Sequence, residues 1–306
     1  MNALCFHHSL VNKKIPILVD STDINYYFQK QGYQTILFDD YDFASQQLAF
    51  AVISDYRYHD RLIRLSHTAK STLVYLLAVR YDINPQIIAY SFEQLLSCDL
   101  TQVLELRSNT YEQIAEVEDE LYLSDHRGTK LKCLLSESLE VINTEDELEP
   151  GSFYSISEML ESGIVNIQSD KSSFSLDGTF FFDGIIYACA NPQVRERHQD
   201  ALTYLLEKVN SSQEKYIHIE DNTITHLILD GRDETSILLE MDYGLERNLS
   251  FTEIGFGCNK NIEKNLNWQI NSIMNQGVYG THIGIGMAQK SPYIDFISQS
   301  LTLPAL

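Results

Sequence analysis

Basic residues are scarce in this 306-residue chain. It has 22 Lys and Arg against 43 Asp and Glu, which gives a formal net charge of −21 at pH 7. Such a field repels a phosphate backbone, so we expect no nucleic-acid partner. The acidic surplus favours solubility and suits a positively charged peptide or metal cations. A solvated acidic surface explains the charge more simply, and nothing in the charge names a substrate.

The sequence also lacks paired cysteines and long apolar runs. Its five cysteines are widely spaced, and no Cys-x-x-Cys pair occurs, which excludes a zinc knuckle and a thioredoxin-like motif. We expect them to be buried free thiols in a reducing compartment. No apolar run approaches the roughly 20 residues that span a bilayer, and the N-terminus lacks the features of a signal peptide. We therefore expect a cytoplasmic protein with no membrane partner.

Familiar catalytic and nucleotide-binding motifs are absent as well. The first hundred residues contain no Gly-x-Gly-x-x-Gly and no Gly-x-x-x-x-Gly-Lys-[Ser/Thr] turn, so no nucleotide site is predicted there. The chain has neither Gly-x-Ser-x-Gly nor His-Glu-x-x-His. The best-known serine-hydrolase and zinc-protease sites are therefore not expected.

The length suggests two domains, because 306 residues exceed one ordinary core. The pattern of apolar and polar residues changes near residue 112. We predict a small α/β domain over 1–112 followed by a β-rich domain over 113–306. Apolar runs and capping residues predict strands over 15–19, 35–38 and 48–53, and helices over 24–31, 91–97 and 101–107. The run over 71–79 is apolar on every side, which fits either a buried helix or a strand, and we favour the helix.

In the second half, strands alternate with acidic turns. The sequence predicts strands over 121–123 and 131–135, an exposed loop over 136–151, a helix over 195–209 and a strand-turn-strand over 216–229. Asp183-Gly184 favours a tight hairpin between 179–182 and 185–187.

Two Gly-alternating segments near the C-terminus are the most informative stretch. Residues 254–257 read Ile-Gly-Phe-Gly and residues 283–286 read Ile-Gly-Ile-Gly, with Glu253 and His282 at their N-terminal edges. Glycine within a strand marks a close backbone approach or a bend. The carboxylate and the imidazole could meet across a cleft. A pair of core strands with a hydrogen-bonded histidine explains the same pattern.

Five short motifs follow one another in a recognisable order. They are Gly128-Thr129-x-Leu131, Pro150-Gly151-x-Phe153, Leu176-Asp177-Gly178-Thr179 with Asp183-Gly184, Glu253-x-Gly255-x-Gly257-x-Asn259, and Gly280-Thr281-His282-x-Gly284-x-Gly286. This succession, over roughly residues 113 to 306, resembles the thermophilic-type metallo-aminopeptidases (peptidase family M29), whose relatives include ring-opening dihydroxypyridine dioxygenases. The resemblance implies an M29 aminopeptidase-like α+β C-terminal domain. The first hundred residues match only in being α/β.

The resemblance implies a metal site built from Glu, Glu, His and a late His-x-Asp segment, and the chain departs from it twice. Glu253 and His282 match. Ile164 stands in the place of the earlier Glu, and Glu161 would fill that place only after a shift of the alignment. Tyr293 stands in the place of the late His. Because a catalytic zinc generally has three protein ligands, we expect no bound metal and no other cofactor.

We interpret the chain as a pseudoenzyme that keeps a peptide-binding cleft, because strand edges and pockets survive the loss of metal ligands. Inactive members of this kind resemble the precursor-peptide-binding proteins of crocagin-type ribosomal peptide (RiPP) biosynthesis. The resemblance implies that the protein binds a ribosomal precursor peptide and presents it to modifying enzymes of natural-product biosynthesis. No catalytic residue is predicted, and local packing explains either tyrosine of the predicted set equally well. The predicted peptide-binding residues are Glu253, Gly255, Tyr279, His282 and Tyr293.

Two alternatives stay open. The first is an active metal-dependent aminopeptidase or ring-cleaving dioxygenase with ligands from other positions, and stoichiometric metal would favour it. The second is a structural partner that only forms an oligomer, since the family commonly dimerises. A homodimer is also compatible with the peptide-binding and enzyme interpretations. The positions that could supply other ligands are His198, His218, His226, Asp177, Asp183 and Asp295.

Overall fold

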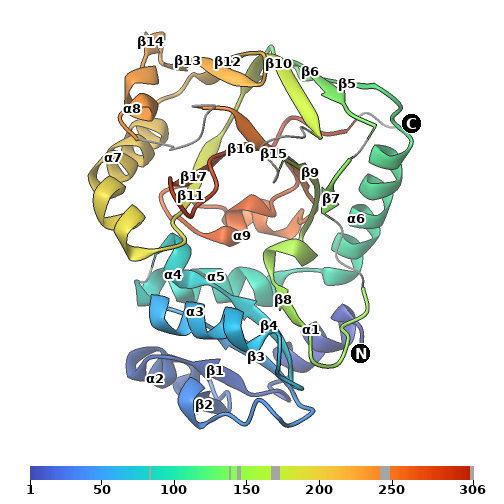
Figure 1. Ribbon diagram of the computed structural model, residues 1–306, viewed down its shortest axis with the longest axis vertical. Coiled ribbons are helices and arrows are strands. Elements are labelled where there is room, and N and C mark those ends of the chain that lie inside the picture. The colour runs from blue at the N-terminus through green and yellow to red at the C-terminus, as the bar shows by residue number, and fades with distance from the viewer. Residues whose placement is uncertain (83, 138, 143–145, 167–172, 242–248, 304–306) are drawn as a thin grey trace.

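The computed structural model describes residues 1–82, 84–137, 139–142, 146–166, 173–241 and 249–303. Within these ranges the strands form three sheets (Figure 1). The N-terminal sheet lies at the bottom of the view, the site sheet at the centre and the outer sheet at the top. The helices pack around and between them.

The N-terminal sheet is parallel, in the order β2-β1-β3-β4-β8. Its strands are β1 (Ile17–Val19), β2 (Thr35–Leu37), β3 (Leu48–Val52), β4 (Thr72–Leu76) and β8 (Phe153–Ser155). The accompanying helices are α1 (Ala3–Val11), α2 (Thr22–Lys30), η1 (Phe38–Asp40), α3 (Tyr56–Leu65), α4 (Ala78–Tyr81), α5 (Pro85–Ser97) and α6 (Leu100–Ala115). The predicted strands and helices of this half are confirmed, apart from 71–79.

The helix predicted over 71–79 is wrong, because most of that run is strand β4. It lies between β3 and β8, and its Leu73, Val74 and Leu76 are buried. A strand inside a parallel sheet is covered on both faces, so its sequence is apolar throughout and resembles a buried helix. The turn that follows β4 is the short helix α4, which carries Arg80 and Tyr81.

The outer sheet is antiparallel, in the order β14-β13-β12-β10-β6-β5. It contains β5 (Glu120–Ser124), β6 (Lys130–Leu135), β10 (Phe174–Phe181), β12 (Lys215–Glu220), β13 (Thr223–Leu229) and β14 (Arg232–Asp233). Helix α7 (Pro192–Ser211) buries Leu202, Leu205 and Val209 in the same core, and α8 (Thr235–Leu239) follows β14. The predicted helix over 195–209 and the strand-turn-strand over 216–229 are confirmed.

The hairpin predicted at Asp183-Gly184 is wrong. β10 pairs with β6 and β12, whereas β11 (Gly184–Ala188) pairs with β17 (Tyr293–Ser298) in the site sheet. The turn therefore carries the chain from one sheet to the next. The Arg127 guanidinium donates to Asp183 Oδ1 at 2.7 Å, and the Gln299 N–H donates to Oδ2 at 2.7 Å. These contacts fix the turn more strongly than its local sequence preference does.

The site sheet is antiparallel, in the order β11-β17-β16-β15-β9-β7. Its other strands are β7 (Val141–Ile142), β9 (Glu161–Val165), β15 (Phe251–Gly257) and β16 (Gly280–Ile285). Because successive side chains point to opposite faces, one face presents a set of large core residues toward the outer sheet. These are Ile164, Ile254, Phe256, Ile283, Ile285, Ile294 and Phe296. The opposite face carries the polar side chains of the candidate site.

Short helices border that second face. η2 (Ser157–Met159) leads into β9, while η3 (Asn261–Asn265) and α9 (Ile273–Gln276) lie between β15 and β16 in the sequence. Buried residues of α9 share a core with the N-terminal helices, as do Ile186 and Ile297 of the site sheet. The polar face thus looks toward the N-terminal half of the chain.

The remaining expectations concern the cysteines, membrane-spanning helices, the loop over 136–151 and the domain boundary. Four cysteines are buried as predicted, but Cys5 is exposed on α1. None of the described helices combines the length and apolarity that a bilayer crossing requires. The loop predicted over 136–151 includes the short strand β7 and lies partly outside the described residues. The boundary at residue 112 stays a prediction; β8, from beyond it, pairs with β4 of the N-terminal sheet.

Candidate functional site

Three side chains of the site sheet converge on one point. Glu161 opens β9, Glu253 lies in β15 and His282 in β16, and their ligand atoms all lie within 4.8 Å of one another. The His282 Nε2 atom is 3.5 Å from Glu253 Oε1 and 3.6 Å from Glu161 Oε2. All three side chains are at least four-fifths buried. We call these residues the acidic cluster.

Glycines make room for this arrangement. A Cβ atom placed on Gly255 would lie 2.1 Å from His282 Nε2, so the imidazole ring lies directly over the glycine backbone. On Gly284 a Cβ atom would lie 2.4 Å from the Tyr293 hydroxyl and 2.6 Å from Asp295 Oδ1. The alternating glycines therefore mark the close approach that the sequence predicted.

The alignment that placed Ile164 at the missing carboxylate is wrong. Ile164 is fully buried among the core residues on the other face of β9. Glu161 lies an odd number of residues earlier, and its side chain points to the face that His282 occupies. The register confirms this, since Glu161 pairs with Gly257 and Gly163 with Gly255. The alternation of faces along β9 therefore favours Glu161 over Ile164 as the ligand.

Tyr293 and Asp295 of β17 extend the acidic cluster. The Tyr293 hydroxyl lies 2.7 Å from Glu253 Oε2 and 2.6 Å from Asp295 Oδ1. A phenol has one proton, so it donates to one carboxylate and can accept from the other only when that carboxyl is protonated. Asp295 is fully buried, and among the described residues its Oδ2 atom has no hydrogen-bond partner.

Burial and nearby charges shift the pKa of Glu161, His282, Tyr293 and Asp295. Burial raises the pKa of Glu161 well above its ordinary value and that of Asp295 to about 7, and Glu253 reinforces both shifts while His282 opposes them. Burial alone would lower the pKa of His282, but Glu253, Asp295 and Glu161 outweigh it and raise the pKa to about 9. The pKa of Tyr293 is raised well above its ordinary value by burial and by the two carboxylates, so the phenol stays protonated.

The acidic cluster fits one divalent metal ion. Ligand atoms at about 2.0–2.2 Å from a tetrahedral zinc lie about 3.3–3.6 Å from one another. The two Nε2 to carboxylate distances, 3.5 and 3.6 Å, match that spacing and are long for direct hydrogen bonds. Within the described residues, Glu161 Oε2 has no hydrogen-bond partner, so this oxygen is available to bind a metal ion. Glu161, Glu253 and His282 would hold the ion and leave one position open.

Metal binding should release protons near neutral pH. Metal coordination requires the lone pair of His282 Nε2, but the raised pKa keeps the imidazole protonated at pH 7. We expect zinc affinity to rise as the pH rises toward about 9, where this group no longer needs to lose a proton. Calorimetric titration of zinc at pH 7 in two buffers with different ionisation enthalpies measures the released protons. Equal heats in both buffers would contradict the expectation.

A cavity of about 340 Å³ lies over the acidic cluster. We call it the site cavity. It falls within the size range of ligand pockets, which is about 300–1,000 Å³. Its lining comes from the turn after β4, from η2 and from four strands of the site sheet. The polar and charged lining residues are Arg80, Tyr81, Ser157, Glu158, Glu161, Asn166, Thr252, Glu253, Gln276 and Tyr293.

Arg195 of α7 holds the turn after β4 in place. Its guanidinium donates to the carbonyl oxygens of Val79, Arg80 and Tyr81 at 2.8–3.0 Å and to the Tyr56 hydroxyl at 3.1 Å. A partly buried cation that bonds three consecutive carbonyls fixes the backbone from which Arg80 and Tyr81 reach the cavity. No local pattern around Arg195 points to this role.

Four of the five predicted binding residues lie together, and one does not. Glu253 and Tyr293 line the site cavity, and His282 and Gly255 lie at its floor. Tyr279 is not among the lining residues; its ring lies under Lys260, with the ammonium 4.2 Å from the ring centroid. Tyr279 precedes the positive-φ Gly280 at the start of β16, where the side-chain alternation of the strand has not begun.

Most of the alternative ligands lie elsewhere. His218 and His226 are cross-strand neighbours in the outer sheet, where His226 pairs with Asp233. Asp177 accepts from the Asp221 N–H, and Asp183 fixes the turn described above. His198 is buried in α7. Only Asp295 joins the site, through Tyr293.

Two solved structures resemble this fold over nearly the whole chain. That of 2,5-dihydroxypyridine dioxygenase from Pseudomonas putida KT2440 covers 96% of this chain and 90% of its own, with a TM-score of 0.51 and 13% identity. Wild-type AmpT from Thermus thermophilus covers 94% of this chain and 87% of its own, with a TM-score of 0.50 and 10% identity. Such low identity shows the fold alone, and the predicted aminopeptidase-like mixed α/β fold is confirmed.

Sequence comparison gives the family. No curated protein sequence matches the chain. The sequence profile of the crocagin biosynthetic protein CgnE/B family matches residues 12–305, which is nearly the whole length. The chain belongs to the crocagin biosynthetic protein CgnE/B family.

Proposed function

We propose that this chain binds a peptide in the site cavity, over a single metal ion held by the acidic cluster, and does not hydrolyse it. The observation that carries the proposal is a cavity of about 340 Å³ with a buried acidic cluster at its floor. Membership of a family named for crocagin biosynthesis supports a precursor peptide as the ligand and modifying enzymes as partners. In this role the protein presents the peptide during natural-product biosynthesis.

The charge of the site cavity favours the amino end of a peptide. Glu158, Glu161 and Glu253 all line the cavity, and Arg80 is its one cationic residue among the described lining. A peptide ammonium would lose water on entering, and the carboxylates replace that hydration with charge-assisted hydrogen bonds. Polar strand backbone at the cavity rim can bind the peptide main chain in addition.

The metal proposed here replaces the sequence-based expectation of no metal. That expectation assumed two ligands, whereas three converge in the structure. A bound divalent ion would polarise a carbonyl group or lower the pKa of a bound water. Glu161 and His282 would each contribute one ligand atom, and Glu253 Oε1 the third.

Tyr293 argues against a second metal. Its hydroxyl lies within hydrogen-bond distance of Glu253 Oε2 and Asp295 Oδ1, two carboxylate oxygens that would otherwise be available to a second cation. The phenol stays neutral and supplies one proton to a pair of carboxylates that a cation would otherwise neutralise. Asp295 Oδ1 is thereby tied to Tyr293. This arrangement supports binding without hydrolysis.

Tyr293→His should raise the zinc content from about one to about two ions per chain, because it removes the phenol and supplies an imidazole between two carboxylates. Tyr279→His is the matched control, since Tyr279 lies outside the site cavity, and it should leave the content unchanged. Elemental mass spectrometry on dialysed proteins measures both. A second ion in the unchanged protein would contradict the role given to Tyr293.

The second candidate function is a one-metal hydrolase or oxygenase. The three converging ligands with an open fourth position favour it, because catalytic zinc sites keep such a position. The two functions differ in what happens to the peptide, so one incubation with mass detection separates them.

A peptide probe with a free amino terminus should bind the zinc-loaded protein about tenfold or more tightly than its N-acetylated form, because acetylation removes the positive charge that Glu158, which lines the site cavity and is not a metal ligand, attracts. The alanine pentapeptide amide is a suitable probe, and calorimetric titration gives both affinities. Equal affinities would place the amino end outside the acidic cluster and overturn this orientation.

A further inference from the structure

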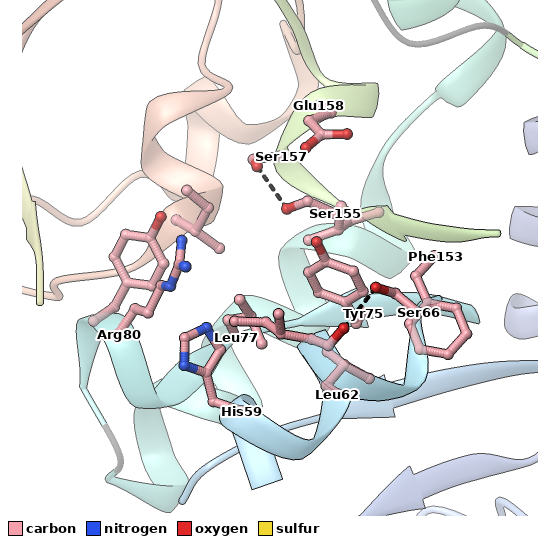
Figure 2. A pocket seen from close by; sticks show the side chains of 14 residues that line it. His59, Leu62, Ser66, Tyr75, Leu77, Arg80, Phe153, Ser155, Ser157 and Glu158 are labelled. Carbon is pink, nitrogen blue, oxygen red and sulfur yellow. Dashed lines mark hydrogen bonds between the residues drawn. The ribbon is translucent and has the colours of Figure 1, made fainter. Parts of the chain in front are cut away.

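A second cavity adjoins the site cavity. It has a volume of about 280 Å³ and lies between α3, β4, β8 and η2 (Figure 2). We call it the side cavity. Arg80, Tyr81, Ser157 and Glu158 line both cavities, so a ligand over the acidic cluster can extend from one into the other. Much of its wall is apolar: Leu62, Ile63, Tyr75, Leu77, Phe153, Ile156 and Ile273.

His59 of α3 contributes a buried polar group to this wall without a hydrogen-bond partner. It is 3% exposed, and neither ring nitrogen has a hydrogen-bond partner among the described residues. Asp60 Oδ1 lies 3.8 Å from Nδ1, beyond hydrogen-bond distance. Burial and the charge of Arg80 lower the pKa of His59 to about 4, so the ring is neutral and keeps one N–H donor. A buried donor left unpaired is costly, and a ligand that accepts from it recovers that cost.

Arg80 contributes an unpaired cation at the junction of the two cavities. Its Nε atom is buried and has no hydrogen-bond partner, and no ion pair of its guanidinium occurs within the described parts of the chain. This is unusual in a chain with 43 acidic and 22 basic side chains. Figure 2 shows Arg80 and His59 on the same side of the side cavity and Glu158 on the far side.

We propose that the side cavity is a subsite for a carboxylate of the bound peptide. Arg80 pairs with the carboxylate through its forked N–H groups, and His59 donates the further hydrogen bond. Leu62, Tyr75 and Leu77 contact the aliphatic part that carries it. The carboxylate belongs either to an acidic side chain or to the C-terminus of a short peptide. The Arg80 guanidinium and the His59 N–H favour an anion as the occupant of this side of the cavity, and Glu158 lies on the far side.

This subsite rests on the proposed function only in taking a peptide as its occupant. The chemistry that recognises a carboxylate is independent of the metal and of the amino end. A small carboxylate therefore tests the subsite by itself, and peptides test its use in peptide binding.

The first experiment titrates butyrate, and its neutral analogue butyramide, into zinc-loaded protein while the His59 ring resonances are followed by NMR. We expect butyrate to shift the His59 signals saturably and butyramide to need about tenfold more ligand. Arg80→Gln should abolish the butyrate response, and Arg80→Lys, which keeps the charge, should retain part of it. Arg64→Gln, on the exposed face of α3, is the matched control and should respond like the unchanged protein. An unmoved His59 signal, or an Arg80→Gln protein that responds normally, would overturn the subsite.

The second experiment identifies the source of the carboxylate. Calorimetric titrations compare Ala-Ala-Asp-Ala amide with Ala-Ala-Asn-Ala amide, and Ala-Ala-Ala free acid with its amide. We expect the acidic member of one pair to bind about tenfold more tightly, and Arg80→Gln to remove that difference. Equal affinities within both pairs would overturn the use of the subsite by peptides. If butyrate binds and none of the peptides does, the proposed peptide function fails and the carboxylate site stands.

Discussion

Glu161→Gln should lower the zinc affinity of this chain about a hundredfold or more, because it removes one of three protein ligands and leaves a neutral amide in a buried site. The unchanged protein presents Glu161 Oε2 and Glu253 Oε1 on either side of His282 Nε2, at separations that suit one tetrahedral ion. With one carboxylate gone, two ligands cannot offset the dehydration of the cation. Competition with a chromophoric chelator measures the affinity.

Two further variants sharpen this result. Glu263→Gln removes an exposed carboxylate from η3 and should leave zinc affinity within about twofold. Ile164→Glu adds a carboxylate where the sequence alignment placed the missing ligand. Because Ile164 lies in the core on the opposite face, we expect that variant to lose about 3 kcal/mol or more of folding free energy and to gain no zinc affinity. A rise in zinc affinity for Ile164→Glu would contradict the strand register described above.

Gly255→Ala should destroy the zinc site and destabilise the fold by about 2–4 kcal/mol, although it adds only one methyl group. That methyl would lie 2.1 Å from His282 Nε2 and 2.4 Å from Cε1, so the imidazole must leave its position over the strand. The ring is fully buried, so it can leave that position only if its neighbours move. Thermal denaturation and chelator competition measure the two effects. A Gly255→Trp substitution would displace the same ring.

A double-mutant cycle identifies the cause of that loss. His282→Ala removes the ring, so adding Gly255→Ala to it should cost much less than Gly255→Ala costs alone. If the two substitutions are additive, the methyl clashes with something other than His282, and the account of the glycine alternation is wrong. The comparison uses folding free energies of the metal-free proteins, so metal binding does not contribute.

Strands and helices with one buried face and one solvent-exposed face are predicted correctly from the sequence. The sequence predicts β12 and β13 from their alternation and α7 from its apolar stripe, because those patterns report burial directly. Prediction from the sequence fails for β4 and for the turn at Asp183, because tertiary contacts determine the structure there. β4 is covered on both faces and so lacks a period, and the bonds from Arg127 and Gln299 override the hairpin preference of Asp183-Gly184.

The candidate site divides in the same way. Glu253, Gly255 and His282 are predicted because glycine alternation and flanking ligands lie within one short stretch. Glu161 is missed because its pairing with Gly257 depends on register across ninety-six residues of sequence. Arg80 and His59 carry no local pattern at all. They become recognisable only when the fold places them in one cavity without partners.

The most direct test of the account is native mass spectrometry of the zinc-loaded protein after overnight incubation with the alanine pentapeptide amide. We predict a complex of one chain, one zinc ion and one intact peptide, and a free peptide pool of unchanged mass. Peptide shortened by one residue would show a hydrolase and contradict the proposed binding role. A protein that carries zinc and binds no peptide would contradict the assignment of the site cavity.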